Sequence, residues 1–226
     1  MRETATTDRA MTKPESRLRT ARKEIIEAVK RLEEEPEHVL HVAALALQIF
    51  DDLKDWHSLA PRDRVLLEAA ASLHDIGWGV APGGAKHHKH SARLIREQRW
   101  RHFHRREIEI IALVARYHRR ALPKARHREF RDLPKADQRR VCLMAAILRV
   151  ADGLDRRHLQ LVRAVRTRMT HHRIVFDVTS SKPLTIEKPA GEKKGDLLRK
   201  LTGRTLFFRW TGLASPAMEM VAQSAP

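Results

Sequence analysis

Long apolar runs are missing from this sequence, and their absence argues against a membrane protein built of spanning helices. No run approaches the roughly 18 residues that such a helix needs. The N-terminal stretch MRETATTDRAMTKPESR also lacks the apolar core of a secretory signal, so we expect a cytoplasmic protein. Because a second methionine stands at position 11, both Met1 and Met11 stay open as the start of translation.

Cysteine is almost absent, and so are several well-known nucleotide-binding motifs. The single cysteine cannot form an internal disulfide, and Cys142 lies in the apolar run VCLMAAIL, where we expect a small buried hydrophobic residue. We find no internal repeat, Walker A loop or dinucleotide fingerprint, since Gly83-Gly84-Ala85-Lys86 lacks the flanking pattern of a phosphate-binding loop. No helix-turn-helix signature stands outside the predicted helical core, which disfavours DNA binding through a recognition helix.

Acidic residues are few compared with basic ones. The chain has 45 Lys and Arg against 28 Asp and Glu, which gives a net charge of +17. Such a field attracts polyanions, including nucleic acid, polyphosphate and nucleotides. An arginine-favouring genome composition explains the same excess equally well. If the arginine-rich stretch from Arg93 to Arg131 forms one face beside the site, it would guide long polyanions toward it.

The sequence predicts a mainly helical domain with a small α+β appendage. Its length, 226 residues, is enough for one hydrophobic core and a small addition. The predicted regions are a disordered N-terminus (1–14), a helical domain (15–167), an α+β tail (168–212) and a flexible C-terminus (213–226). Apolar periodicity predicts helices over 15–34, 37–54, 62–74, 87–98, 105–118, 137–150, 152–166 and 191–201. Strands are predicted for 172–180, 184–187 and 205–210, and loops for 77–84 and 121–136.

Histidine and aspartate stand at the ends of the apolar helices. Fourteen histidines make any single one weak evidence, but their positions are informative. His38 opens a predicted helix, His74-Asp75 closes the apolar segment VLLEAAASLHDIG, and Asp152 follows VCLMAAILRVADGLD. Buried imidazoles and carboxylates are costly unless they are paired or bind a cation. Two imidazoles and two carboxylates can enclose a divalent metal and leave positions for water and substrate.

This order of residues resembles the HD superfamily of metal-dependent phosphohydrolases. The segments HDIG, HHKHS, ARYHR and RVADGLDR, together with VAALALQIFDDL, resemble the C-terminal helical domain of the exopolyphosphatase/guanosine pentaphosphatase family over about residues 20–210. The resemblance implies an HD-type helical bundle. It also implies one or two divalent ions of Mn, Fe, Co, Ni, Zn or Mg.

The ligand set follows from the resemblance, residue by residue. It implies His38, His74, Asp75 and Asp152 as primary ligands, with His41 as the alternative to His38. Two-metal members add two further histidines, which His87 and His118 match here, with Asp75 bridging the ions. His90 shares a helical face with His87 and is the alternative to it. Asp75 and His74 are the expected catalytic residues, with Asp75 orienting the attacking water or taking its proton.

Several basic residues near these positions are predicted to bind phosphate. Arg149, Asp152 and Arg156 have the spacing of one helical face, so an arginine beside the metal could contact a phosphate oxygen. Lys89, Arg93, Arg116 and Arg119 flank the other histidines and are further candidates. Trp78, in the glycine-rich loop, is either a packing residue or part of the mouth of the site.

Two hypotheses about the function are compatible with the sequence. The first is an enzyme that hydrolyses a nucleotide, an alarmone or short polyphosphate. The second is a module that binds polyphosphate or nucleic acid, or that partners a separate exopolyphosphatase-type protein. The family's actin-like domains are absent, and no Gly-Tyr-Pro follows His118, which argues against cyclic-dinucleotide hydrolysis. A homodimer is compatible with the sequence, and no membrane partner is expected.

Overall fold

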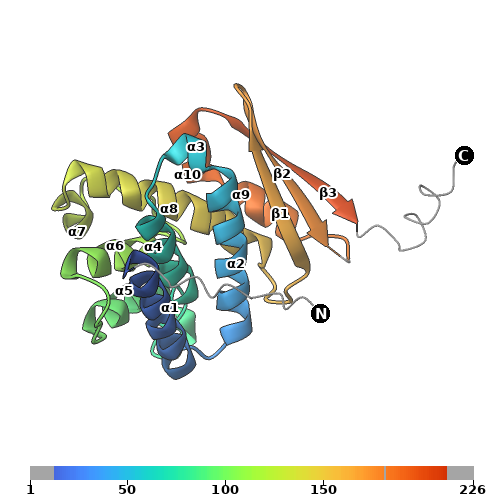
Figure 1. The fold of residues 1–226 in the computed structure, drawn as a ribbon. Helices are drawn as coiled ribbons and strands as arrows, with labels where there is room; N and C mark the ends of the chain where they lie inside the picture. Colours follow the sequence, from blue (N-terminus) through green and yellow to red (C-terminus); the bar gives the residue numbers. More distant parts are fainter. Residues whose placement is uncertain (1–12, 181, 213–226) are drawn as a thin grey trace, which may run out of the picture.

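The structure, a computed structural model, describes residues 13–180 and 182–212 (Figure 1). The predictions for residues 1–12 and 213–226 lie outside these ranges, and residues 13 and 14 begin the first helix. The helical part comprises α1 (Lys13–Leu32), α2 (Pro36–Asp52), α3 (Lys54–His57), α4 (Pro61–Ser72), a 3-10 turn (Pro82–Gly84), α5 (His87–Glu97), α6 (Arg105–Arg116), α7 (Arg128–Arg131) and α8 (Lys135–Leu154). The appendage comprises β1 (Val162–Met169), β2 (Arg173–Ser180), α9 (Glu187–Lys194), α10 (Asp196–Thr202) and β3 (Thr205–Gly212).

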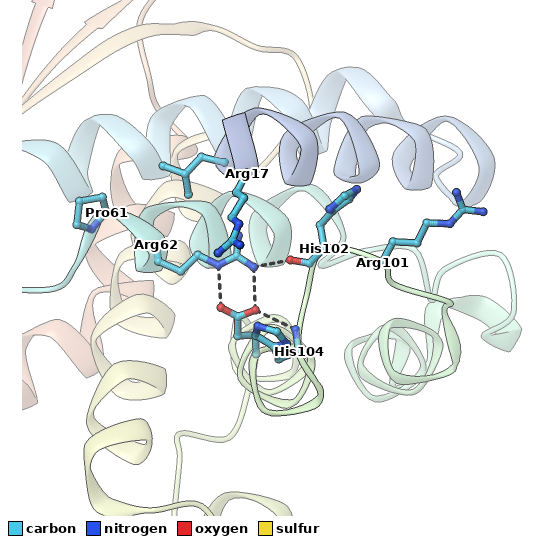
Figure 2. A pocket seen from close by; sticks show the side chains of 8 residues that line it. Arg17, Pro61, Arg62, Arg101, His102 and His104 are labelled. Atoms are coloured by element: carbon cyan, nitrogen blue, oxygen red, sulfur yellow. Dashed lines mark hydrogen bonds and ion pairs between the residues drawn. The ribbon is translucent and has the colours of Figure 1, made fainter. Parts of the chain in front are cut away.

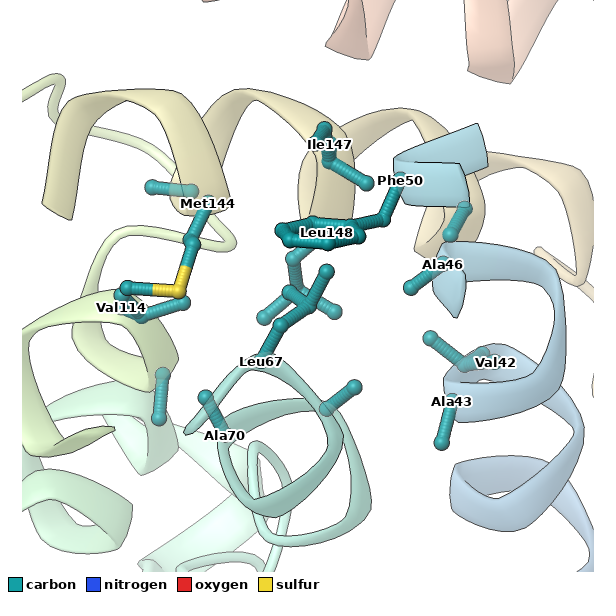
Figure 3. Close-up of a cluster of buried hydrophobic side chains, with 14 of the residues drawn as sticks. Val42, Ala43, Ala46, Phe50, Leu67, Ala70, Val114, Met144, Ile147 and Leu148 are labelled. Carbon is teal, nitrogen blue, oxygen red and sulfur yellow. The ribbon is translucent and has the colours of Figure 1, made fainter. Parts of the chain in front are cut away.

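Four helices make the core. Side chains of α2, α4, α6 and α8 converge in Figure 3, where Phe50, Leu67, Val114 and Met144 lie around Leu148. All of them are buried. α8 is buried on nearly every side, and it contacts α2, α4 and α6. Its C-terminal residues are therefore held deep in the molecule.

The small sheet has the order β1-β2-β3, with β1 antiparallel and β3 parallel to β2. Its buried face is apolar and includes Phe176 and Phe208, whose rings stack with centroids 4.6 Å apart. The free edge of β1 is bound to α2, because Gln48 accepts from the Val165 N–H at 2.8 Å and Asp52 from the Thr167 N–H at 2.7 Å. α2 thus lies between the sheet and the other core helices (Figure 1).

The crossover from β2 to β3 runs over the end of α8. A Cβ added at Gly153 would lie 2.7 Å from the Gly191 Cα, which shows how closely α9 approaches α8. This contact places the last turn of α9, and Lys194 with it, beside Asp152.

The fold confirms the mainly helical class with a small appendage, but several predicted elements were wrong. No helix covers 152–166, since α8 ends at Leu154 and β1 begins at Val162, inside the range predicted for the helical domain. Residues 184–187 form a turn into α9 rather than a strand, and the helix predicted over 191–201 is divided between α9 and α10. The predicted loop 121–136 contains α7 and the start of α8. In the described part of the chain, no helix is both long and apolar enough to cross a membrane.

Candidate metal centre

The ends of five helices meet at one buried centre. His38 lies in the first turn of α2, and His87 is the first residue of α5. His74 and Asp75 follow the end of α4, His118 follows α6, and Asp152 lies in the last turn of α8. All six side chains are buried, with exposed fractions of 0–7%. The structure therefore brings together every residue predicted as a metal ligand.

Each of the four imidazoles is fixed through its Nδ1 atom. His74 lies 2.7 Å from the Ala71 carbonyl oxygen, His118 2.7 Å from that of Ala115, and His87 2.9 Å from that of Gly84. His38 Nδ1 lies 2.8 Å from a carboxylate oxygen of Asp155. Carbonyl and carboxylate oxygens only accept hydrogen bonds, so Nδ1 carries the proton and Nε2 keeps its lone pair in His38, His74 and His118. At His87 the guanidinium of Arg119, which only donates, also lies 3.2 Å from Nδ1, so the tautomer of this ring does not follow from the Gly84 contact.

The four Nε2 atoms surround the Asp75 carboxylate. Nε2 of His87 and His118 lie 3.3 and 3.5 Å from Oδ1, and Nε2 of His74 and His38 lie 3.6 and 4.0 Å from Oδ2. Nε2 of His87 and His118 are also only 3.4 Å apart. Nε2 of His38 and His74 and Oδ1 of Asp75 are buried without a hydrogen-bond partner. A divalent cation would satisfy these lone pairs at once, so the residues fit such an ion.

Three overlapping groups of ligand atoms in the described residues can hold an ion. Within each group, all ligand atoms lie within 4.8 Å of one another; the groups are His38, His74 and Asp152, then His74, Asp75 and His118, and then His38, Asp75 and His158. The arrangement suits one or two ions, and imidazole with carboxylate suits transition metals. Lys194 forms an ion pair with Oδ2 of Asp152, so a cationic side chain already faces the first group. Burial lowers the pKa of Lys194 to about 7.

The geometry distinguishes between the alternative ligands, and between the roles of Trp78, that the sequence left open. His41 is half-buried and is in none of the ligand groups, whereas His38 is in two of them. His90 is also half-buried, while His87 faces Asp75. Trp78 stacks on His87 with centroids 4.6 Å apart and lines the mouth of the centre, so it serves both roles considered for it.

Asp155 is a supporting residue that the sequence analysis missed. One of its oxygens accepts from His38, and the other accepts from the Gln160 N–H at 2.8 Å. The sequence feature that could have indicated this role is the position of Asp155, three residues after Asp152. Lys194 was missed too, and nothing in its local sequence indicates a contact with a residue 42 positions earlier.

Asp155→Asn is expected to lower the affinity for the first metal ion by about 10- to 100-fold while the fold is retained. An amide has one acceptor oxygen, so it cannot accept from both Gln160 and His38, and His38 loses its fixed tautomer. Calorimetric titration with Mn²⁺ measures the effect. Asp132→Asn, at an exposed aspartate, is the control. Equal affinity in the two variants would contradict this role of Asp155.

Acid is expected to destabilise the metal-free protein. Burial lowers the pKa of His74 and of His88 from 6.5 to about 4. The unfolded chain therefore binds more protons between pH 6.5 and 4, so stability is present above this window and is lost as the pH falls through it. The lowered pKa of His74 alone should reduce the free energy of unfolding by about 2 to 3 kcal/mol at pH 4.5 relative to pH 7. Urea denaturation at pH 7 and 4.5 measures this loss.

The matched variants for this test are His88→Gln and His171→Gln. His88 is buried with an unpartnered Nδ1, whereas His171 is exposed. On acidification from pH 7 to 4.5, we expect His88→Gln to lose less free energy of unfolding than the wild-type protein. We expect His171→Gln to lose as much as the wild-type protein. A free energy of unfolding that does not vary between pH 7 and 4.5 would contradict the assignment of neutral buried rings.

Most of the predicted phosphate-binding bases are not placed to bind phosphate. Arg149 is buried, forms a two-point ion pair with Asp196 and donates to the Tyr117 carbonyl oxygen. Arg156 lies beyond the end of α8, so it does not share a helical face with Asp152. Arg149 thus has partners that the sequence did not indicate, because Asp196 is distant in sequence, and its contact with phosphate stays a prediction.

The remaining bases differ in their surroundings. Arg93 pairs with Glu97 on the exposed face of α5. Lys89 is exposed, and a guanidinium nitrogen of Arg119 lies 3.2 Å from Nδ1 of His87. The structure thus places Arg119 and Lys194 at the centre, although Lys194 was not predicted.

Several arginines of the arginine-rich stretch are bound to acids. The pairs are Arg93–Glu97, Arg96–Glu109, Arg106–Asp137, Arg116–Glu129 and Arg128–Asp132. The residues that line the mouth of the metal centre are instead Glu33, Glu34, Glu35, His38, Asp75, Trp78 and His158, with no lysine or arginine among them. The lining of this mouth is therefore acidic, and a guiding basic face stays a prediction.

A larger cavity than the one at the mouth of the centre lies elsewhere. It measures about 540 Å³ and is lined by residues that include Arg17, Pro61, Arg62 and His104 (Figure 2). Pro61 begins α4, whereas His74 follows its end, so the helix separates cavity and centre by about 18 Å at 1.5 Å per residue. Arg62 is already bound to Glu107 on its floor.

A helical bundle whose helix ends bring histidines and aspartates to one centre is a domain of the HD type. The family model described as Ppx/GppA phosphatase, domain III, matches residues 22–190, which is most of the chain. The chain therefore belongs to this family of phosphatase domains, and the resemblance drawn from its motifs is confirmed.

Proposed function

We propose that the chain is a metal-dependent phosphohydrolase acting on a phosphoanhydride or phosphoester. The observation that carries the proposal is the convergence of four imidazole Nε2 atoms on the Asp75 carboxylate, within a phosphatase-family domain. A purely structural domain gains nothing from buried acceptors that face one another, because each costs free energy when unpaired.

The side chains of the centre divide into ligands and groups that act on the reactants. A divalent cation held there supplies Lewis acidity, which makes a water nucleophile available near neutral pH and stabilises phosphoryl charge. Asp75 orients that water or takes its proton, and His74 is a ligand fixed by the Ala71 carbonyl. Lys194 and Arg119 supply positive charge where the phosphoryl oxygens develop negative charge.

The substrate class is a nucleotide, an alarmone or short polyphosphate. The alternative function is a polyanion-binding or regulatory module that partners a separate exopolyphosphatase-type protein, in which any metal would be structural. The complete ligand set supports the enzyme, because a binding or regulatory module does not need one. Nucleic-acid binding and a homodimer remain predictions.

Metal analysis of the purified protein, followed by a phosphate-release screen with Mn²⁺, Co²⁺ and Mg²⁺, tests the proposal. We expect bound transition metal and release of inorganic phosphate that depends on it. Tight binding of polyphosphate without any phosphate release, in the metal-loaded protein, would favour the binding module instead.

A further inference from the structure

The larger cavity at the start of α4 has the size and the lining of a second binding site. Its volume of about 540 Å³ lies within the range of about 300 to 1,000 Å³ that is usual for small-molecule sites. Three parts of the fold enclose it (Figure 2). α1 contributes Arg17 and Leu18, α4 contributes Pro61 and Arg62, and the segment between α5 and α6 contributes Arg101. None of these residues belongs to the metal centre.

Positive charge exceeds negative charge in this cavity. Three arginines line it, Arg17, Arg62 and Arg101, against one acid, Glu107. Both oxygens of Glu107 accept from Arg62, at 2.7 and 2.8 Å, so this acid neutralises Arg62. The side chains of Arg17 and Arg101 are exposed and have no partner among the described residues. Two positive charges are therefore left for an anionic ligand.

The arginines of the cavity are positioned before any ligand binds. Arg62 donates to the His102 carbonyl oxygen at 2.6 Å, and its guanidinium carbon lies 4.9 Å from the centre of the Phe103 ring. In Figure 2 the side chain of Arg17 extends from α1 toward Arg62. Two guanidinium groups that share one cavity repel each other, and an anion bound to both removes this cost. Phosphate groups suit such a place, because arginine binds their oxygens at two points.

The segment that carries Arg101 is also fixed. The carboxylate of Glu24, on α1, accepts from the Arg101 N–H at 2.6 Å and from the His102 N–H at 3.0 Å. The third arginine is thereby held on the wall opposite α4. Since the three arginines come from three separate walls, one phosphate group does not match their arrangement as well as a chain of two or three.

A further part of the lining is apolar or flat rather than charged. Leu18 and Pro61 supply apolar surface, and the imidazole rings of His102 and His104 are exposed. Imidazole rings can stack on a nucleic-acid base. A phosphate chain alone would leave these surfaces without a partner, whereas a nucleoside joined to the phosphates would cover them.

We propose that this cavity binds a nucleoside di- or triphosphate, at a site separate from the metal centre. The arginines bind the phosphate chain, and the base lies against Leu18 and Pro61. α4 separates the site from the centre by about 18 Å, so both can be occupied at once. The inference does not depend on the proposed hydrolysis.

Calorimetric titration with ATP in the presence of EDTA tests the site. The chelator removes divalent ions, so binding does not pass through the metal centre. The variants are Arg17→Gln and Arg101→Gln, at exposed positions where the fold is expected to persist, and circular dichroism checks it. The control is Arg128→Gln, which removes the same charge from an arginine on α7 that is 83% exposed. Inorganic tripolyphosphate, titrated into the wild-type protein, measures binding without a nucleoside.

We expect the wild-type protein and Arg128→Gln to bind ATP with equal affinity. Arg17→Gln and Arg101→Gln should each bind it about tenfold or more weakly, because each loses a charged hydrogen bond to phosphate. Tripolyphosphate should bind more weakly than ATP. Equal affinity for ATP in all four proteins, or no binding by the wild-type protein at low salt, would overturn the site. Tripolyphosphate that binds as tightly as ATP would overturn the assignment of a nucleoside. None of these results bears on phosphate release at the metal centre, because the titrations contain no free metal.

Discussion

Asp75→Ala is expected to lower metal-dependent phosphate release on the order of 10³-fold, with the fold retained. The carboxylate lies 3.3 to 4.0 Å from four imidazole Nε2 atoms, so its removal takes away the carboxylate on which the four rings converge. It also removes the group that orients the attacking water. Phosphate release at saturating Mn²⁺ measures the loss.

The control for this variant is Asp132→Ala, which removes an exposed aspartate that pairs with Arg128 and Arg131. Surface pairs of this kind contribute about 0 to 1 kcal/mol, so activity should match that of the wild-type protein. Circular dichroism shows whether Asp75→Ala keeps its helices. Unchanged turnover of a folded, metal-loaded Asp75→Ala protein would remove Asp75 from the mechanism.

Gly77→Ala is expected to reduce activity by about 10²-fold through a displacement of α5. An added Cβ would lie 2.3 Å from the His87 carbonyl oxygen and 2.5 Å from the Ser91 nitrogen, both backbone atoms. Relief of these contacts requires a shift of about 1 Å, since ordinary contact begins near 3.4 Å. The shift would also break the 3.0 Å hydrogen bond from the Gly77 N–H to the Ser91 hydroxyl. His87 begins α5, so it moves away from Asp75.

Gly83→Ala separates this effect from backbone strain. Gly83 belongs to the same loop, has φ +56°, and an added Cβ meets nothing within 4 Å. The substitution costs about 1 to 2 kcal/mol of stability through the left-handed conformation, and activity is expected to persist. We expect Gly77→Ala to lose both stability and affinity for the second metal ion. Equal behaviour of the two variants would show that the close approach of α5 does not position His87.

Local pattern predicted most of the helices, and the resemblance to the family implied all six proposed ligands. The end of α8 was predicted wrongly for a local reason. A register shift between Val162 and Ala164 places the buried Val162 and Val165 three residues apart, which imitates a helical face. The sequence alone could not distinguish this bulged strand from a helix.

The partners of the charged residues depended on the tertiary fold. Arg149 looked available for phosphate because Asp196, which binds it, lies 47 residues later. Lys194 reaches the centre only because α9 crosses the end of α8. His158 reaches it only because a left-handed turn follows α8. Contacts between such distant segments leave no periodic signal, so neither residue was predicted to be part of the site.

The central claim is that His38, His74, Asp75 and Asp152 hold a catalytic metal ion. A crystal structure of the protein grown with Mn²⁺, with anomalous data, tests it most directly. The account predicts an anomalous peak about 2.0–2.5 Å from Nε2 of His38 and His74 and from oxygens of Asp75 and Asp152. A structure with no peak there at saturating Mn²⁺, and with Lys194 still bound to Asp152, would contradict it.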